Sequence, residues 1–192
     1  MEIILDAAAA LIAEGGAESL TMQALADRAR TSKGSLYHFF PDLQAVLCAL
    51  ADRHGVAITA LTTELIADRS VDWPRLTLDQ TIDRFLAPVA YLAAHPDLLA
   101  LARTPMVLDR ATRRLTPIRE LALHILGRRC AGLPARQRLA AASTMVALLD
   151  GIVGYSLRCD DVPRQLMLVE LRRVLRAYLG ELGECARGVS RR

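Results

Sequence analysis

The sequence predicts an all-α protein with a small N-terminal helical domain and a larger helical C-terminal domain. Three observations support this class: apolar residues recur at helical spacing, Ala and Leu abound, and the β-branched and aromatic runs typical of strands are missing. Of the 192 residues, 53% are hydrophobic and 23% are charged. A chain of this composition can bury a core and has no disordered character.

The N-terminal helices follow from local start and stop signals. Thr21 is a predicted N-cap, Thr31 or Ser32 begins the next helix, and Asp42 caps a long one after the break at Pro41. Helices are therefore expected over about residues 2–14, 21–29, 32–39 and 42–69. Three short helices followed by one long helix place a domain boundary near residue 45, with domains at 1–45 and 46–192.

Proline punctuates the remainder of the chain, where it starts, kinks or ends helical segments. Helices are expected over 75–94, 97–103, 107–131, 135–159 and 164–184. No strand alternation and no internal repeat interrupts this pattern. The C-terminal part is therefore expected to be a helical bundle.

Charge is unevenly distributed along the chain, whose formal net charge is +3. Residues 1–55 hold four basic and seven acidic side chains, yet three of the basic ones lie at Arg28, Arg30 and Lys33, the only lysine. A local positive patch of this kind is what phosphate contacts require.

Other features of the sequence limit where in the cell the protein is expected and which chemistry it is expected to carry. The sequence shows no secretory leader and no uncharged apolar run near the ~18 residues of a membrane span, so a cytoplasmic protein is expected. The four cysteines lack metal-ligand spacing and are expected to be reduced thiols. No metal or cofactor is expected.

Residues 21–40 (TMQALADRARTSKGSLYHFF) have the pattern of two short helices joined by a tight turn. In a helix-turn-helix, the N-terminal residues of the second helix touch base edges in the major groove. Here that helix would begin with small hydroxyl residues, Lys33 and Gly34, while Leu36, Phe39 and Phe40 would hold it against the other helices. The spacing alone is a weak signal, because many bundles contain a short helix pair.

The strings ILDAAAALIAEGGAESLT, MQALADRA and TSKGSLYHFFPD resemble the N-terminal domain of the tetracycline-repressor (TetR) family over about residues 1–50. This resemblance implies an all-helical homodimer that binds a palindromic DNA operator, in most cases as a repressor released by a small molecule. It implies DNA contacts by Thr21, Arg30, Thr31, Ser32, Lys33, Gly34, Ser35, Tyr37 and His38. Two positions depart from the family pattern: Arg30 stands where the turn commonly has Gly, and Leu43 where a Lys is usual.

The C-terminal domain is expected to bind an apolar or amphipathic effector and to form the dimer. Candidate ligand-lining residues are the larger aromatic, Met and polar side chains of its helices: Trp73, Phe85, Tyr91, Met106, Leu123, His124, Met145 and Tyr155. The dimer interface is expected on the wide apolar faces of the last two helices, at Leu139, Val146, Leu149, Gly151, Val153, Gly154, Leu171, Leu175 and Tyr178. Gly151 and Gly154 suggest a close helix–helix approach there.

Two other classes of protein compete with this interpretation. An enzyme of the helical-bundle metal type would need inward Glu-x-x-His pairs, whereas the four histidines lie isolated at 38, 54, 95 and 124. No nucleophile motif, phosphate-binding Gly loop or CxxC supports catalysis either. A ligand-binding helical protein without operator function is the alternative that Arg30 and Leu43 leave open.

Overall fold

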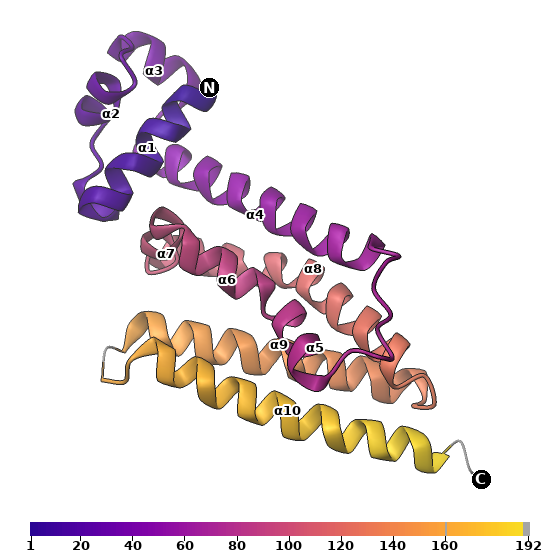
Figure 1. Cartoon of the computed structure of the whole chain (residues 1–192). Helices are drawn as coiled ribbons and strands as arrows, with labels where there is room; N and C mark the ends of the chain where they lie inside the picture. Colours follow the sequence, from indigo (N-terminus) through magenta and orange to yellow (C-terminus); the bar gives the residue numbers. More distant parts are fainter. Residues whose placement is uncertain (160, 190–192) are drawn as a thin grey trace. The chain divides into compact units, whose positions relative to one another are not determined.

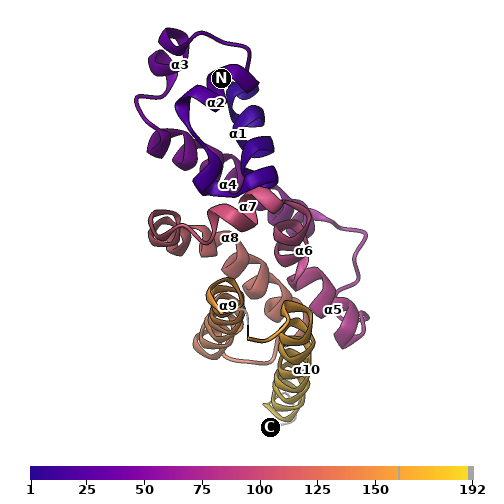
Figure 2. The same ribbon diagram turned by 90° about the vertical axis from the view of Figure 1, so that its left-hand side faces the viewer.

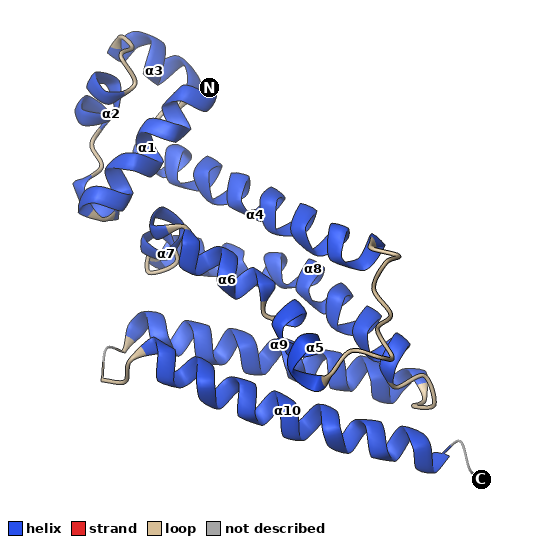
Figure 3. Ribbon diagram, viewed as in Figure 1, coloured by secondary structure: helices blue, strands red, loops and turns tan. Residues whose placement is uncertain are grey.

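The structure is a computed structural model that describes residues 1–159 and 161–189, apart from the side chains of 105–114 and 187–189. Across these residues it contains helices and loops and no strand (Figure 3). The chain divides into two compact units. Unit 1 comprises residues 1–58 and 89–113, and unit 2 comprises residues 59–88 and 114–192.

The helices follow one another along the chain as Figure 1 labels them. In order they are α1 (Glu2–Gly15), the 3₁₀ turn η1 (Ala17–Ser19), α2 (Met22–Arg28), α3 (Lys33–Phe39), α4 (Leu43–Ala67), α5 (Leu78–Phe85), α6 (Ala87–Ala94), α7 (Pro96–Leu101), α8 (Pro105–Arg129), α9 (Ala135–Arg158) and α10 (Arg164–Val189). The short turn η1 was not expected from the sequence. The helix expected over 75–94 is two helices, because Pro88 has no N–H to continue the ladder across the break at Leu86.

Unit 1 is organised around one apolar core that α1, α2, α3, the first half of α4 and α7 share. Its fully buried members include Ala8, Leu25, Leu36, Leu50 and Leu101. Because α2 and α3 are only seven residues each, they are too short to be stable alone and depend on this packing.

In unit 2, α9 and α10 run side by side and antiparallel, as the two views in Figures 1 and 2 agree, and α10 also packs against α5. Met145 on α9 and Leu171 and Leu175 on α10 are fully buried. The loop before α9 approaches α10 closely, since a Cβ on Gly132 would lie 2.5 Å from the Ala186 carbonyl oxygen.

Two of the described helices, α4 and α9, are long and apolar enough to cross a membrane by length and composition alone. Such helices are weak indicators, because core helices of soluble proteins pass the same test. The middle of α4 carries Asp52, Arg53 and His54, which a membrane-spanning helix would have to bury in hydrocarbon.

Candidate functional site

The two helices of the predicted helix-turn-helix begin at side-chain caps. The Thr21 hydroxyl accepts a hydrogen bond from the Ala24 N–H at 3.0 Å, and the Ser32 hydroxyl accepts one from the Ser35 N–H at 3.1 Å. Both predicted N-caps are confirmed, with Ser32 rather than Thr31 at the start of α3. Each cap satisfies a backbone donor that the first turn would otherwise leave free.

The turn between α2 and α3 is closed by two backbone hydrogen bonds. The Thr31 N–H donates to the Ala26 carbonyl at 3.0 Å, and the Arg30 N–H donates to the Asp27 carbonyl at 3.2 Å. This pair of bonds is a Schellman motif, which requires a left-handed residue after the helix. Arg30 takes that conformation with φ 51°, the only non-glycine with positive φ among the described residues. A left-handed conformation costs an L-residue such as Arg about 1 kcal/mol more than it costs Gly, the residue common at this position in the family.

The outward face of α3 holds the residues expected to contact DNA. Lys33, Gly34, Ser35, Tyr37 and His38 are all exposed, while Leu36 is fully buried in the core of unit 1. Nothing lies within 4 Å of a Cβ built on Gly34, so its backbone is open to a close approach. Of the remaining predicted residues, Thr21, Arg30 and Ser32 are exposed and Thr31 is partly buried.

One apolar residue of α3 does not pack as predicted. Leu36 and Phe40 are buried, but Phe39 is 47% exposed and lies edge-on against His38 with ring centroids 5.5 Å apart. Phe39 and Phe40 are successive residues, whose side chains point about 100° apart at 3.6 residues per turn, and it is Phe40 that joins Leu36 in the core. The expectation that Phe39 anchors the helix is wrong.

The positive patch at residues 28–33 is smaller than the sequence indicates. Both terminal nitrogens of Arg28 donate to the Glu14 carboxylate, at 2.9 and 2.6 Å, and this contact raises the pKa of Arg28 and lowers that of Glu14. Arg28 therefore fastens α2 to α1. Among the described residues, Arg30 and Lys33 have no ion-pair partner, so they carry the positive charge of this surface.

Leu43, where the family usually has Lys, packs partly buried against the core of unit 1. It follows the Asp42 cap, whose Oδ1 accepts from the Ala45 N–H at 2.7 Å. An apolar contact thus takes the place of the charge at the start of α4.

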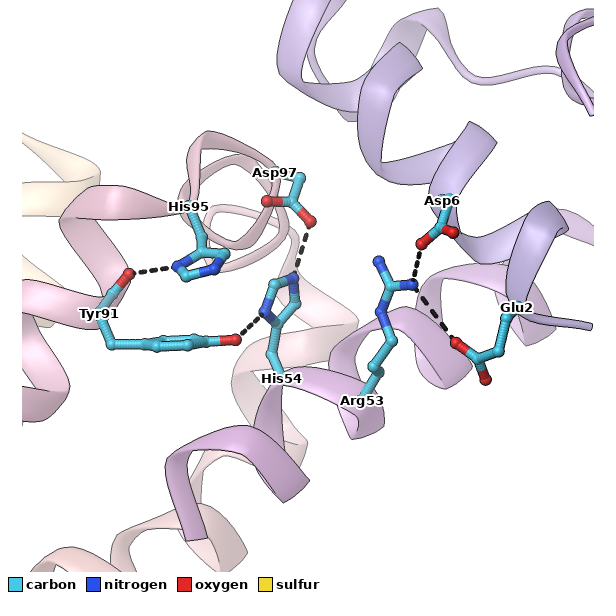
Figure 4. Close-up of polar contacts among 7 residues, drawn as sticks. All are labelled: Glu2, Asp6, Arg53, His54, Tyr91, His95 and Asp97. Carbon is cyan, nitrogen blue, oxygen red and sulfur yellow. Dashed lines mark hydrogen bonds and ion pairs between the residues drawn. The ribbon is translucent and has the colours of Figure 1, made fainter. Parts of the chain in front are cut away.

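A buried chain of polar side chains lies deeper in unit 1 (Figure 4). Nε2 of His54 is 2.7 Å from Asp97 Oδ2, and its Nδ1 is 3.0 Å from the Tyr91 hydroxyl. A carboxylate can only accept, so the neutral imidazole donates from Nε2 to Asp97 and accepts from Tyr91 at Nδ1. Burial lowers the pKa of His54 against the opposing effect of Asp97, and burial also raises the pKa of Tyr91. Each polar atom of the imidazole is thus satisfied in the neutral form.

The same cluster joins residues that look isolated in the sequence. His95 stacks on Tyr91 with ring centroids 3.9 Å apart, and its ring lies 5.4 Å from that of His54. Tyr91, expected to line a ligand site, is thus engaged within unit 1. Sequence patterns missed His54 and Asp97, which are 43 positions apart. Among the described residues no group of three or more His, Cys, Asp or Glu side chains could hold a metal ion.

Next to this cluster, Arg53 is paired with two acidic residues of α1 (Figure 4). Its Nη1 is 2.6 Å from Asp6 Oδ1 and 3.6 Å from Glu2 Oε2. Half-exposed pairs of this kind contribute modestly to stability, but here they fasten α4 to α1, the helix on which α2 also rests.

The other candidate ligand-lining residues lie mostly in unit 2 and differ in exposure. Trp73, Phe85 and Met145 are buried, Leu123 and His124 are partly buried, and Tyr155 is 41% exposed and donates to Asp161 at 3.2 Å. Met106 lies outside the residues whose side chains are described. The Trp73 and His124 rings meet edge to face with centroids 5.5 Å apart.

The residues predicted for a dimer interface divide between core and surface. Val146, Leu149, Leu171 and Leu175 are buried inside the single chain, where α10 packs against both α9 and α5. Val153, Gly154 and Tyr178 are partly buried, and Leu139 and Gly151 are exposed. The large exposed apolar side chains of these two helices are Leu139, Tyr155, Leu166, Val169 and Val174, of which Leu139 alone belongs to the predicted set.

Comparison with known proteins agrees with the N-terminal motif. Residues 4–50 match the family described as bacterial regulatory proteins, tetR family. A stretch of 73 residues is 36% identical to the HTH-type transcriptional repressor KstR of Mycobacterium tuberculosis. That stretch is 38% of this chain and 33% of the repressor, so the chain spans about a third of the length of the curated relative it matches.

Solved structures extend the likeness to nearly the whole chain. A TetR-family transcriptional regulator from Streptomyces coelicolor is 28% identical with a TM-score of 0.60, over 94% of this chain and 95% of that one. A TetR transcriptional regulator from Legionella pneumophila, at 18% identity and a TM-score of 0.62, covers 91% of this chain and 94% of its own and shows the same fold. These matches confirm the predicted all-α class with an N-terminal helix-turn-helix, and the proteins that they name are regulators of transcription.

Proposed function

We propose that this chain, which belongs to the tetR family of bacterial regulatory proteins, is a cytoplasmic repressor that binds a palindromic operator as a homodimer. A small molecule held by the C-terminal helices would release it. The observation that carries the proposal is α3, a capped helix whose buried Leu36 leaves Lys33, Gly34, Ser35, Tyr37 and His38 facing outward. Such a face suits insertion into a major groove.

The individual DNA contacts follow from the chemistry of each exposed group. Lys33 and Ser35 stand at the start of α3, where base edges are read, and Tyr37 one turn later suits a phosphate oxygen. Thr21 begins the helix that braces the DNA backbone, and Arg30 offers a second charge to phosphate. Since residues 1–55 are net acidic, few phosphate contacts are available, and affinity would depend strongly on two half-sites bound at once.

A second copy of the chain would pack on the exposed face of α9. Ser143, Ala147 and Gly151 recur there at every fourth position and are all exposed, so the face is lined by small residues. Nothing lies within 4 Å of a Cβ built on Gly151. Small residues let a second helix approach closely, which would offset the cost of glycine inside a helix. Leu139 and Tyr155, also exposed on α9, would supply apolar area.

For this function we assign DNA reading to about residues 1–45, and effector binding and dimerisation to residues 46–192. The apolar helices of the second segment suit an apolar or amphipathic effector, because such sites are mostly apolar with a few polar groups.

The DNA-binding step is tested with Lys33→Ala and DNA from beside the protein's own gene. If Lys33 meets a phosphate, the plot of log affinity against log salt should become shallower by about one unit. If it reads guanine, discrimination between operator and mutated operator should fall instead. Arg75→Ala is the matched control, since it also removes one exposed positive charge but lies in unit 2. An isotherm unchanged by Lys33→Ala would refute both roles, and no salt-sensitive binding by the unaltered protein would favour a ligand-binding protein without an operator.

The dimer is tested separately with Gly151→Leu. Because open space surrounds Gly151 in the single chain, the fold should tolerate the larger side chain, which circular dichroism would check. The dissociation constant of the dimer should rise by about tenfold or more, because the larger side chain blocks a close helix contact. An unchanged dissociation constant in sedimentation equilibrium would show that the interface does not lie on this face of α9.

A further inference from the structure

Two buried nitrogen atoms of unit 2 have no hydrogen-bond partner among the described residues: Trp73 Nε1 and His124 Nε2. Within the described part of the chain, no other buried side-chain nitrogen or oxygen atom lacks a hydrogen-bond partner. Buried polar groups are nearly always paired, so each exception calls for an explanation. Here both exceptions belong to rings in direct contact, with centroids 5.5 Å apart and planes 72° from parallel.

Both rings are held in place by other interactions. Trp73 is 1% exposed, and its carbonyl accepts a hydrogen bond from Arg129 at 2.9 Å. The Arg84 guanidinium carbon lies 5.8 Å from the centre of the Trp73 ring. Burial lowers the pKa of His124, and the nearby charge of Arg128 lowers it further, so the imidazole is neutral at pH 7. The site therefore has a fixed indole, a neutral imidazole and a guanidinium, but no described carboxylate or carbonyl that accepts from the indole N–H.

The chemistry of these groups defines what they would bind. An indole nitrogen only donates, so its partner must supply an acceptor oxygen. A neutral imidazole also donates from Nε2 when that nitrogen carries the proton. Arg84 places a positive charge 5.8 Å from the centre of the Trp73 ring. The interior of unit 2 is apolar, and Phe85, Met145 and Leu121 are among its fully buried side chains.

We propose that Trp73 Nε1 and His124 Nε2 bind the carboxylate or carbonyl oxygen of an otherwise apolar small molecule, and that this molecule is the effector of the regulator. The second half of this statement rests on the proposed function, whereas the binding itself does not. The ligand oxygen would supply the hydrogen-bond partner that the described residues do not. An apolar molecule without the oxygen would leave the nitrogens unpaired and would bind weakly.

The chain offers a direct reporter of this site, because Trp73 is its only tryptophan. Fluorescence of the intact protein would be followed during titration with decanoate, methyl decanoate and decane. We expect the acid and the ester to change the Trp73 emission and to raise the thermal midpoint, and decane to bind about tenfold more weakly or worse. Stronger binding of the acid would assign a charge contact to Arg84, and stronger binding of the ester would assign a neutral carbonyl, both within the proposal. Equal binding of decane, or no response to octanoate, decanoate, dodecanoate or their esters, would overturn it.

A pair of matched variants separates a ligand site from an ordinary core contact. His124→Phe keeps a ring and removes the unpaired nitrogen, so the thermal midpoint without ligand should stay the same or rise while decanoate affinity falls about tenfold. His95→Phe removes an imidazole whose Nδ1 donates to the Tyr91 carbonyl at 2.7 Å, so its midpoint should fall and its decanoate affinity should not change. Trp73→Phe, read by calorimetry, should also lower decanoate affinity, although the cavity left by the smaller ring should lower its midpoint. A midpoint that falls as far in His124→Phe as in His95→Phe would mean that the nitrogen is already paired, which overturns the proposal.

Operator release is measured in a separate titration. Ligand binding that changes Trp73 emission but leaves the operator complex intact would contradict ligand-controlled repression. It would still support the proposed ligand site. Operator binding together with no ligand response would contradict the proposed ligand site but would remain consistent with a DNA-binding regulator.

Discussion

His54 in unit 1 and His124 in unit 2 are both largely shielded from water, and burial is the main cause that lowers the pKa of each. They differ in their partners. His54 uses both ring nitrogens, between Asp97 and Tyr91, whereas Nε2 of His124 has no partner among the described residues. The same side chain is therefore a completed internal contact in one unit and an unpaired one in the other.

This difference corresponds to what each unit is proposed to do. Unit 1 must present α3 in one fixed geometry, and its caps, its Schellman turn and its buried histidine chain all complete their hydrogen bonds internally. Saturated buried networks favour one rigid arrangement. Unit 2 would need to respond to a molecule from outside, and groups left unpaired in the free state are the groups that a ligand can satisfy.

The largest effect is expected from His54→Leu, which breaks the completed network. It leaves the buried Asp97 carboxylate without its partner, so the free energy of unfolding should fall by about 3 kcal/mol. Denaturation by urea would measure the loss.

The control for His54→Leu is the double variant with Asp97→Leu, which removes both polar partners. It should lose less than the sum of the two single variants, because no unpaired charge stays buried. Additive losses would show that the two side chains are not coupled.

Intermediate effects are expected from the helix caps, which occur in both units. Thr21→Ala, Ser32→Ala and Thr77→Ala each remove a side-chain acceptor at a helix start and should each lower stability by about 1 kcal/mol. Thermal denaturation would compare all three. Only Thr21→Ala and Ser32→Ala should also weaken operator binding, since α5 lies in unit 2; weaker binding by Thr77→Ala would contradict this division.

The smallest effect is expected from pH. The folded pKa values of His54 and His124 lie below the ordinary 6.5, so below that pH the unfolded chain takes up protons more readily than the folded one. The free energy of unfolding should therefore fall as pH drops below about 6.5 and should be insensitive to these groups above it. His124→Phe should remove part of this dependence in melting curves at several pH values, and a stability that rises on acidification would contradict the assignment.

Local sequence signals were sufficient to predict much of the secondary structure of residues 1–45. Thr21, Ser32 and Asp42 cap helices because each hydroxyl or carboxylate reaches a backbone N–H three residues on. Arg30 takes the left-handed conformation that its place after α2 demands. Such features depend on neighbours within a few positions, and the sequence displays those neighbours directly.

Surface and core could not be separated in the same way. The apolar face predicted for dimerisation includes Leu171 and Leu175, which are buried by packing within the chain, and Phe39 is exposed although it is aromatic. Asp150 follows Leu148 and Leu149 in the sequence, and yet it is exposed. Periodicity identifies an apolar face and does not tell which partner covers it.

The sequence by itself determined the all-α class and the helix starts at Thr21 and Asp42, because helix periodicity and caps are short-range. The helix-turn-helix over residues 21–40 needed, in addition, the resemblance to the TetR family. Only the tertiary structure decided that Glu14 neutralises Arg28, that Asp97 and Tyr91 complete His54, and that Trp73 and His124 face each other with unpaired nitrogens. These contacts join residues 14 to 43 positions apart, or 51 in the case of the two rings. Their formation depends on how helices pack, which no local pattern encodes.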